Sequence, residues 1–446
     1  EAATPIDEWL RTATLPGLPV TRVSADFYDA PSENIPYICR YMAGTLVAKL
    51  RGTGLFGDDP SLAFTLESDD LRARRLELAK RFGTVNTIIE TPPTTNRISG
   101  GYEDGVGTLS ANMQWWNGGS TKLDMTLPLI WDSEHTVPSL AERGDVTGRA
   151  DFDRMPLQAV LAWLAGAVNV EGILQGSVSA QGTVRNPSFV GSVDLTDGRV
   201  DLRTVGQTLE DVTGRAIFDE DGVAISDLKA TDTNGNATVN GRVGFKKLRL
   251  NNADFSVKAD SFPLRQEGSI VARVEGNARM LAEFEDEALT GEVRLQKLTI
   301  DIPESSATPQ DLAQHPEVFI IGTDYTPVEE PPPYPVKLKL RSEDRIVILS
   351  RDQGFNVEAR ADLDTTITDD LFVEGRVSLE TGNFRVFGKR FEIRSGSMIF
   401  DGDPEMDAKV DLVARHSLRG SNDTVTVTVS GRLSKPVIEF SSSIAT

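Results

Sequence analysis

The chain has almost none of the residues on which disulfide, metal and histidine-dependent chemistry rely. Among its 446 residues there is one cysteine, Cys39, and three histidines, His135, His315 and His416, which lie far apart. A single cysteine cannot form an intrachain disulfide, and the histidines have neither metal-ligand spacing nor a neighbouring nucleophile. The sequence therefore favours a protein that is not an enzyme and that uses no cofactor or metal.

Positive charge and long apolar runs are also scarce. Lysine and arginine number 46 against 67 aspartates and glutamates, which gives a net charge of −21. This charge repels phosphate backbones, so nucleic acid is not an expected partner. The longest apolar run, "LQAVLAWLAGAVNVEGIL", is interrupted by Gln158, Asn169 and Glu171 and does not predict a membrane span. The chain starts with "EAATPIDEWL", without an initiator Met or a signal, so we expect a fragment whose anchor is missing.

Two short motifs imitate ligand sites but lack residues that such sites need. The stretch "GTGLFG", Gly52 to Gly57, has dinucleotide-fingerprint spacing, yet "DDP" follows it and puts negative charge where pyrophosphate should bind. In "DTNGN", Ala237 stands where a calcium loop needs glycine, and Val243 where it needs a bidentate glutamate. Neither motif is interpreted as a ligand site.

What the sequence does contain is a period-two alternation of apolar and polar residues, from about Gly105 onward. Such alternation predicts β-strands with one apolar face, joined as an antiparallel meander. The clearest strands are "SIVARVEGNARMLAEF", "VKLKL", "FNVEARADL", "MDAKVDLVA" and "VTVTVSGRL", and the predicted turns are "TDGR", "DEDG", "TNGN" and "RDQG". The ambiguous "ESDDLRARRLELAKRFG" is interpreted as strand in preference to helix.

Helices are predicted in only one or two places. The clearest is Pro156 to Ala165, which begins with proline and is followed by Gly166. A loose internal repeat matches "DFYDAP" at Asp26 to Pro31 with "DFDRMP" at Asp151 to Pro156. So few helices cannot cover the apolar face of a long sheet. The predicted fold is therefore all-β: an elongated, curled antiparallel groove, open-barrel-like or taco-shaped, with about 20 to 25 strands and a length of roughly 100 Å.

The chain is expected to divide into four consecutive parts. Residues 1–104 would be the N-terminal portion of the groove with a short helix, and 105–302 the central groove with the helix at 156–165. Residues 303–335, which include "EEPPPYP", predict a proline-rich loop. Residues 336–446 would form the C-terminal groove.

The alternating apolar positions are the candidate lining of the groove. In "GNFRVFGKRFEIRSGSMIF", for example, Gly382, Gly388 and Gly396 would supply the reversals or bends between short apolar runs. The predicted lining residues are Ile270, Val274, Met280, Phe284, Val293, Leu295, Val336, Leu338, Phe355, Val357, Val377, Leu379, Phe384, Val386, Phe391, Ile393, Phe400, Val410, Leu412, Val425, Val427 and Val429.

The C-terminal run from Leu371 to Ser443 carries a recognisable order of motifs. A glycine- and aromatic-rich hairpin ends in "GSMIF", a proline and an Asp-rich strand "DPEMDAKVDLVARHS" follow, and "VTVTVSGRLSKPVIEFSSS" closes with glycine and proline at Gly431 and Pro436. This order resembles the C-terminal domain of the TamB family, one of the AsmA-like bridge families. "QGTVRNPSFVGSVDLTDGRVDL" and "LTGEVRLQKLTIDIPES" extend the resemblance back to about Asp151, while the first hundred residues match loosely.

The resemblance implies a periplasmic protein of Gram-negative bacteria, anchored in the inner membrane by an N-terminal helix that this chain lacks. It implies the outer-membrane barrel protein TamA as partner, and a role in phospholipid transport or in inserting outer-membrane proteins. An apolar groove could shelter acyl chains, because about 16 CH₂ groups would cost about 13 kcal/mol to expose to water. The main hypothesis is a phospholipid conduit, and the alternative is a chaperone whose strand edge templates barrel strands. A surface adhesin is a third, disfavoured possibility.

Overall fold

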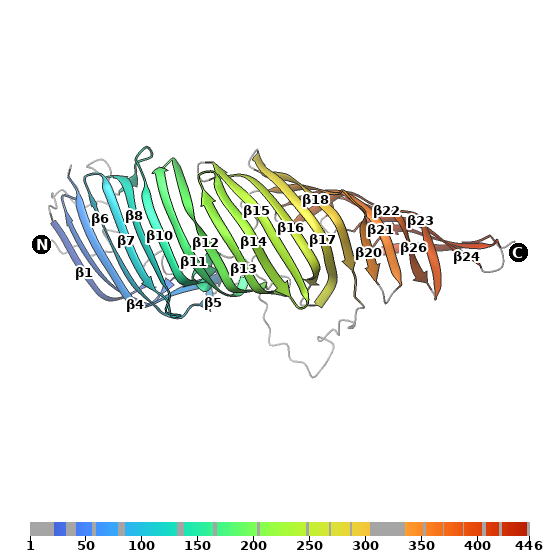
Figure 1. The fold of residues 1–446 in the computed structure, drawn as a ribbon, viewed down its shortest axis with the longest axis horizontal. Coiled ribbons are helices and arrows are strands. Elements are labelled where there is room, and N and C mark those ends of the chain that lie inside the picture. The colour runs from blue at the N-terminus through green and yellow to red at the C-terminus, as the bar shows by residue number, and fades with distance from the viewer. Residues whose placement is uncertain are drawn as a thin grey trace, which may run out of the picture.

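The protein is described by a computed structural model in which 26 strands form one elongated sheet (Figure 1). The described residues are 22–32, 42–55, 59–78, 85–131, 138–163, 167–202, 206–246, 249–266, 269–285, 288–303, 335–350, 354–368, 370–386, 388–403, 407–418 and 422–443. The elongated, curled all-β fold predicted from the alternation is confirmed.

The strands follow the alternating segments of the sequence. The first thirteen are β1 (Arg22–Pro31), β2 (Met42–Ala43), β3 (Thr45–Thr53), β4 (Ser61–Leu78), β5 (Val85–Glu90), β6 (Thr94–Glu103), β7 (Val106–Gln114), β8 (Ser120–Ile130), β9 (Ser139–Leu140), β10 (Thr147–Pro156), β11 (Ala167–Thr183), β12 (Asn186–Leu202) and β13 (Gln207–Asp219). The others are β14 (Gly222–Asp232), β15 (Gly235–Lys246), β16 (Arg249–Gln266), β17 (Ser269–Glu285), β18 (Ala288–Asp301), β19 (Val336–Ser342), β20 (Ile346–Ser350), β21 (Phe355–Ile367), β22 (Leu371–Val386), β23 (Lys389–Asp401), β24 (Lys409–Ser417), β25 (Thr424–Arg432) and β26 (Lys435–Ser442). The ambiguous segment after Glu67 is strand as far as Leu78, as predicted.

The strands pair antiparallel, mostly with the next strand along the chain, and the parallel pairings are confined to one joint at β18. β19 and β20 lie end to end, and both run parallel to β18 and antiparallel to β21. The purely antiparallel meander predicted for "VKLKL" is therefore wrong at this joint, because a parallel step needs a crossover connection in place of a tight turn. That connection is the predicted proline-rich segment, of which 304–334 lie outside the described residues.

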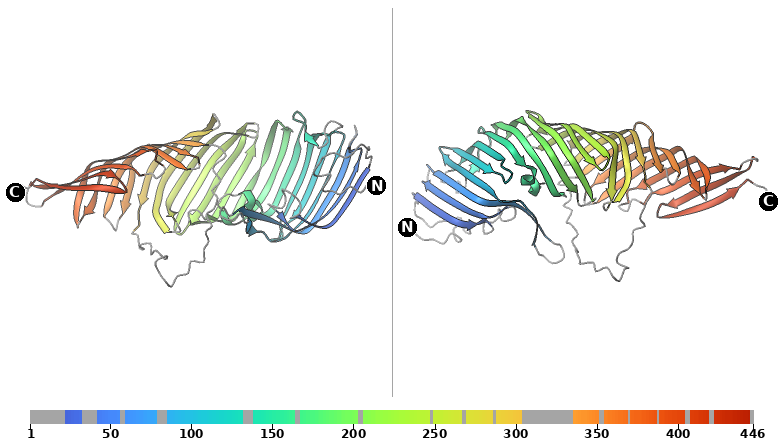
Figure 2. Two further views of the ribbon diagram at one scale, coloured as in Figure 1. Left: turned by 180° about the vertical axis from the view of Figure 1, so that it is seen from behind. Right: turned by 60° about the horizontal axis from the view of Figure 1, so that its bottom comes forward.

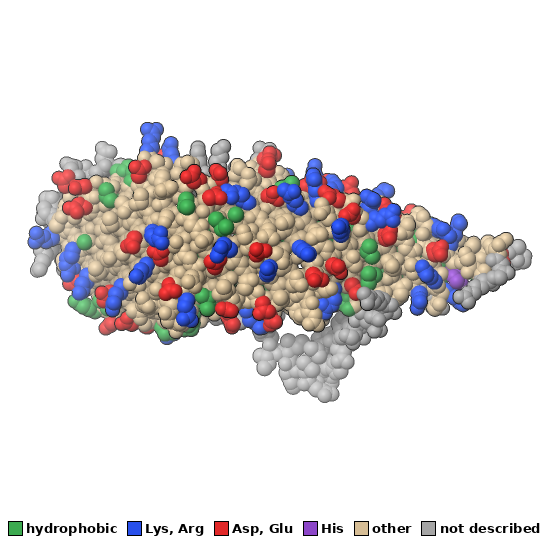
Figure 3. Space-filling view, viewed as in Figure 1, with side chains coloured by type: hydrophobic (Ala, Val, Ile, Leu, Met, Phe, Trp, Pro, Cys, Tyr) green, Lys and Arg blue, Asp and Glu red, His purple; other side chains and the backbone are tan. Residues whose placement is uncertain are grey.

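The register gives the sheet two chemically different faces. Directly paired residues project to the same side of a sheet, so the pairing defines rows across the strands. One such row is Phe152, Gly176, Val193, Ala216, Ile225, Gly241, Phe255, Met280, Val293, Leu340 and Leu363. We call the face that carries this row the inner face. The opposite, outer face carries charged side chains such as Asp194 and Arg215, which are paired with each other across β12 and β13. Figure 3 shows Lys, Arg, Asp and Glu side chains spread over one face along the length of the sheet.

A series of β-bulges bends the strands. At seven irregularities of pairing a residue other than glycine adopts φ between 48° and 52°: Asp29, Arg154, Asp197, Asp211, Asp227, Ser261 and Lys297. Bulges increase twist and bend the strand that contains them. Three of these residues lie in the successive strands β12, β13 and β14. We call the line of bulges the crease, and it accounts for the curl seen in Figure 2.

Several turn predictions can be compared with the structure. "DEDG" and "TNGN" do join β13 to β14 and β14 to β15. "TDGR", in contrast, lies inside β12, because Asp197 forms a bulge there and the chain does not reverse. "RDQG" falls mostly outside the described residues. Gly388 does supply the reversal between β22 and β23, with φ of 75°.

The predicted helix is present but is shorter and tighter than expected. It is the 3-10 helix η2, Leu157–Trp163, and Pro156 is the last residue of β10. Leu157 and Val160 pack against Val170 and Leu174, which lie on the inner face. The counterpart that the internal repeat predicts after Pro31 would fall at 33–41, outside the described residues.

Candidate functional site

The predicted lining residues gather on one face. By register, Val377 pairs with Met398, and Met398 pairs with Val410 on the same side. The same reasoning places on the inner face every predicted residue except two. Ile270 lies beyond a pairing irregularity at the start of β17, and the side chain of Val386 is outside the described part of the chain.

Burial divides these residues into two groups. Val357, Phe391, Ile393 and Val427 are buried, whereas the other predicted lining residues whose side chains are described are half-buried. Burial in a single-layered sheet means that neighbours in the lining already cover the side chain. Only the half-buried group therefore presents apolar surface to an occupant of the inner face.

The best-packed part of the C-terminal lining is an aromatic cluster on β22 to β25. Phe391 is 4% exposed and packs with Ala414 and Val427. Its ring stacks on Phe384, with centroids 6.0 Å apart, and contacts His416 at 5.4 Å. The His416 Nδ1 lies 2.8 Å from the carbonyl oxygen of Arg390. This histidine belongs to the lining, a placement that was not predicted.

The lining also includes residues toward the N-terminus, in strands for which no lining residue was predicted by name. Strands β3 to β8 carry inner-face residues such as Leu50, Phe64, Leu109 and Met125. The alternation of "VGTLSANMQ" was the signal for them. It was missed because threonine, serine and asparagine dilute the apolar pattern there.

Pairs of oppositely charged side chains lie on the outer face and keep it hydrated. Arg215 Nε donates to Asp194 Oδ1 at 2.5 Å, and this side-chain hydrogen bond lowers the pKa of Asp194. Arg279 Nη2 donates to Asp254 Oδ2 at 2.9 Å. Exposed pairs of this kind contribute little to the stability of the fold, because water screens them. Because these charged groups stay hydrated, the outer face is a poor binding surface for apolar ligands.

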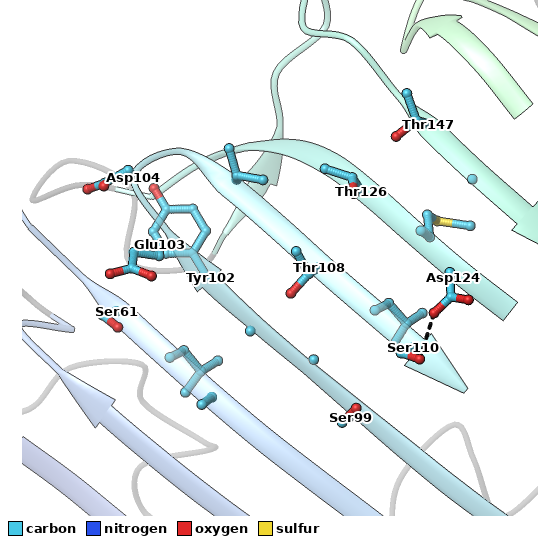
Figure 4. Close-up of a pocket in the computed structure, with 18 of the residues that line it drawn as sticks. Ser61, Ser99, Tyr102, Glu103, Asp104, Thr108, Ser110, Asp124, Thr126 and Thr147 are labelled. Carbon is cyan, nitrogen blue, oxygen red and sulfur yellow. Dashed lines mark hydrogen bonds between the residues drawn. The ribbon is translucent and has the colours of Figure 1, made fainter. Parts of the chain in front are cut away.

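A hollow of about 1070 Å³ lies on the outer side of β4, β6, β7, β8 and β10 (Figure 4). Short hydroxyl side chains such as Ser99 and Thr108 line it, and Ser110 donates a 2.7 Å hydrogen bond to Asp124. Within the described ranges, no group of three or more histidine, cysteine, aspartate or glutamate side chains is arranged to hold a metal ion. None of the helical residues described forms a segment long and apolar enough to cross a membrane.

A single-layered, curled sheet with an apolar inner face and an ion-paired outer face defines an elongated β-groove protein. Residues 226–444 match the family described as the TamB C-terminal domain, so the chain belongs to the TamB family through its C-terminal half. The match begins further along the chain than Asp151, where the resemblance read from the sequence started. No curated protein matches the chain.

Membership sets the general role. The TamB family is a non-enzymatic component of the translocation and assembly module, is associated with the cell envelope, and has the outer-membrane protein TamA as its general partner.

Proposed function

We propose that the inner face carries phospholipid acyl chains along the sheet, between the inner and the outer membrane. The observation that supports this most directly is the continuous inner-face row from Phe152 to Leu363, which contains only apolar residues and glycine. A chain sliding along this row would meet no charged side chain. The proposal assigns no catalytic role and needs no cofactor.

The energetics favour a continuous path over isolated pockets. An acyl chain of about 16 carbons loses about 13 kcal/mol if it is exposed to water, and each half-buried lining residue returns part of that amount when it is covered. Neighbouring strands lie about 4.8 Å apart, so an acyl chain that moves along a row leaves one strand only as it contacts the next. No single step then requires the whole chain to be wetted.

Photo-crosslinking tests the path with matched positions. A photoreactive residue at Val377 faces inward, and one at Arg376 faces outward at the same level of β22. The pair Leu412 and Asp411 repeats the comparison on β24. In cells, Val377 and Leu412 should capture phospholipid, and Arg376 and Asp411 should not. Equal capture at both positions of each pair, or none at either, would refute the conduit for this segment.

A charge placed on the path should block it. Val377→Asp puts a carboxylate among the apolar side chains, whereas Ser378→Asp adds the same charge to the outer face. Burying an ionised carboxylate against an acyl chain is costly, and the outer charge stays in water. Val377→Asp should slow phospholipid transfer between membranes while Ser378→Asp leaves it unchanged. Both variants should remain folded by circular dichroism.

A second function, assembly of outer-membrane barrel strands, is favoured by β26. Within the described part of the chain, β26 pairs only with β25, and every residue of β26 is exposed. Val437, Ile438 and Phe440 are 52%, 55% and 55% exposed. An exposed apolar edge strand is a template for strand addition. A photoreactive residue at Val437 that captures client polypeptides would support this function, and capture of lipid alone would oppose it.

The partner and the location follow the same reasoning. We propose that the chain works in the periplasm with TamA or a related outer-membrane barrel protein, and that an N-terminal segment outside this sequence holds the whole protein in the inner membrane. Family membership supports both statements. Co-purification of TamA with the full-length protein, and its loss when β26 is removed, would test the first.

A further inference from the structure

The two ends of strands β22, β23 and β24 carry opposite charge. We call one end the basic margin, and it consists of the last four residues of β22 and of β24 and the first four of β23. Its charged residues are the basic Arg385, Lys389, Arg390 and Arg415 and the acidic Glu392. The corresponding residues at the other end of these strands include the acidic Glu374, Asp401 and Asp411 and the basic Lys409. In a chain of net charge −21, the basic margin is a local excess of positive charge.

The basic side chains of this margin are not neutralised by the fold. All four are exposed, and none of them forms an ion pair with another described residue. Glu392 accepts its hydrogen bond from Arg394, at 3.3 Å, and a further acidic residue near this end, Asp423, precedes β25. Arg385 and Arg390 lie directly opposite each other, a pairing of like charges that opposes folding. Positive charge left in this way attracts anions from solution.

The basic margin borders the apolar lining of the inner face. Lys389 shares that face with Phe391, which lies two residues further along β23 and therefore about 7 Å away. Phe384, which stacks on Phe391, is half-buried and leaves part of its ring uncovered. The lining thus ends next to a lysine at this margin.

His416 belongs to both the lining and the margin. Its ring lies 5.4 Å from that of Phe391, and its Nδ1 is 2.8 Å from the carbonyl oxygen of Arg390. A carbonyl oxygen only accepts hydrogen bonds, so Nδ1 carries the proton of this bond. Figure 3 shows this histidine in purple toward the C-terminal end, with Lys and Arg side chains in blue near it.

The three arginines of the margin approach it from the other side of the sheet. Arg385 and Arg390 alternate with Phe384 and Phe391 along their strands, so they project from the outer face. Arg415 projects from the same face, because it pairs directly with Glu392, the neighbour of Phe391. The strands end here, and long basic side chains can extend past a strand end while their stems cover apolar surface. Positive groups therefore flank the margin on both faces.

We propose that the basic margin binds the phosphate of an anionic phospholipid head group while the acyl chains lie on the neighbouring inner face. The inference rests on the proposed conduit function. A head group must stay in water when its acyl chains are covered by the sheet, so it lies at a margin. Guanidinium and ammonium groups form charge-assisted hydrogen bonds with phosphate oxygens. A head group that also carries a cation is repelled by the same residues, so anionic lipids are preferred over zwitterionic ones.

Calorimetric titration of the chain with short-chain lipids tests this preference. Dihexanoyl-phosphatidylglycerol and dihexanoyl-phosphatidylcholine have the same acyl chains, and both are used as monomers. The chain should bind the phosphatidylglycerol at least tenfold more tightly. Lys389→Gln and Arg390→Gln should each weaken its binding by roughly fivefold, the effect of one basic residue near anionic lipid, and leave phosphatidylcholine binding unchanged. Lys409→Gln, at the other end of the strands, is the matched control and should change neither affinity.

Three results would overturn the proposal. Equal affinity for the two lipids, unaffected by Lys389→Gln and Arg390→Gln, would refute the basic margin and leave the conduit standing. Inorganic phosphate that binds as tightly as phosphatidylglycerol would show a site for free anions. Binding to phosphatidylglycerol vesicles without binding of the monomeric lipid would assign the margin to a membrane surface. Failure of the conduit is distinguished from these results, because it would appear as no capture of any phospholipid at Val377.

Discussion

Replacing Phe391 with alanine should loosen the C-terminal strands. Phe391 is 4% exposed and its ring contacts Phe384 and His416. Removing a buried phenylalanine costs about 3–5 kcal/mol in closely packed cores. Because a single-layered sheet lets water reach the vacated space, we expect the lower end of that range, about 3 kcal/mol.

Amide hydrogen exchange measures this loss locally. If exchange proceeds through opening of β23 to β25, a loss of about 3 kcal/mol lowers protection of these strands by roughly 150-fold, since about 1.4 kcal/mol corresponds to tenfold. Phe440→Ala is the matched control, because this side chain is 55% exposed and should cost under about 1 kcal/mol. Equal loss of protection in the two variants would refute the view that the aromatic cluster is the local core.

Three further predictions concern other parts of the sheet. Arg242 lowers the pKa of Asp219 from 3.8 to about 2, chiefly through a side-chain hydrogen bond, so the stabilisation by this pair is complete above pH 3.8 and is lost as pH falls toward 2. NMR titration should show that Arg242→Gln returns the Asp219 pKa toward 3.8, at a cost under about 1 kcal/mol because the pair is exposed. At the bulge residue Asp197, with φ of 51°, valine should cost about 1–2 kcal/mol and glycine almost nothing, as measured by denaturant unfolding. Asp232→Asn should cost about 3 kcal/mol by the same measurement, because Arg265 would keep its charge with only 21% of its side chain exposed. A loss no larger than that of Arg242→Gln would contradict this.

The sequence predicted the architecture because the physical cause of the fold is local. Alternation along "SIVARVEGNARMLAEF" decides which side chains share a face, and hairpin pairing carries that choice from strand to strand. A register error of one residue would move all the apolar side chains of a strand to the other face of the sheet. Met280 and Val293 lie on the same face because they pair directly.

Features that depend on distant contacts were not predictable in this way. The sequence around the bulge at Asp197, "TDGR", is also typical of a β-turn. The chain continues as a strand there because β12 pairs with both β11 and β13. The parallel joint at β18 requires knowledge of where the chain returns after a long connection. The hydrogen bonds that the Asp70 carboxylate accepts from Thr45 were not predicted either, because the two residues are 25 positions apart in the sequence.

The crease has a consequence for how the protein behaves when it is empty. Four of its seven left-handed residues are aspartates, which tolerate this conformation better than most side chains. The backbone conformation of the bulges therefore sets the curvature of the sheet, and no bound ligand is needed to bring its two margins closer together. The protein without bound lipid should keep the same curved cross-section as the protein with it. The width of the groove is then fixed before any lipid binds.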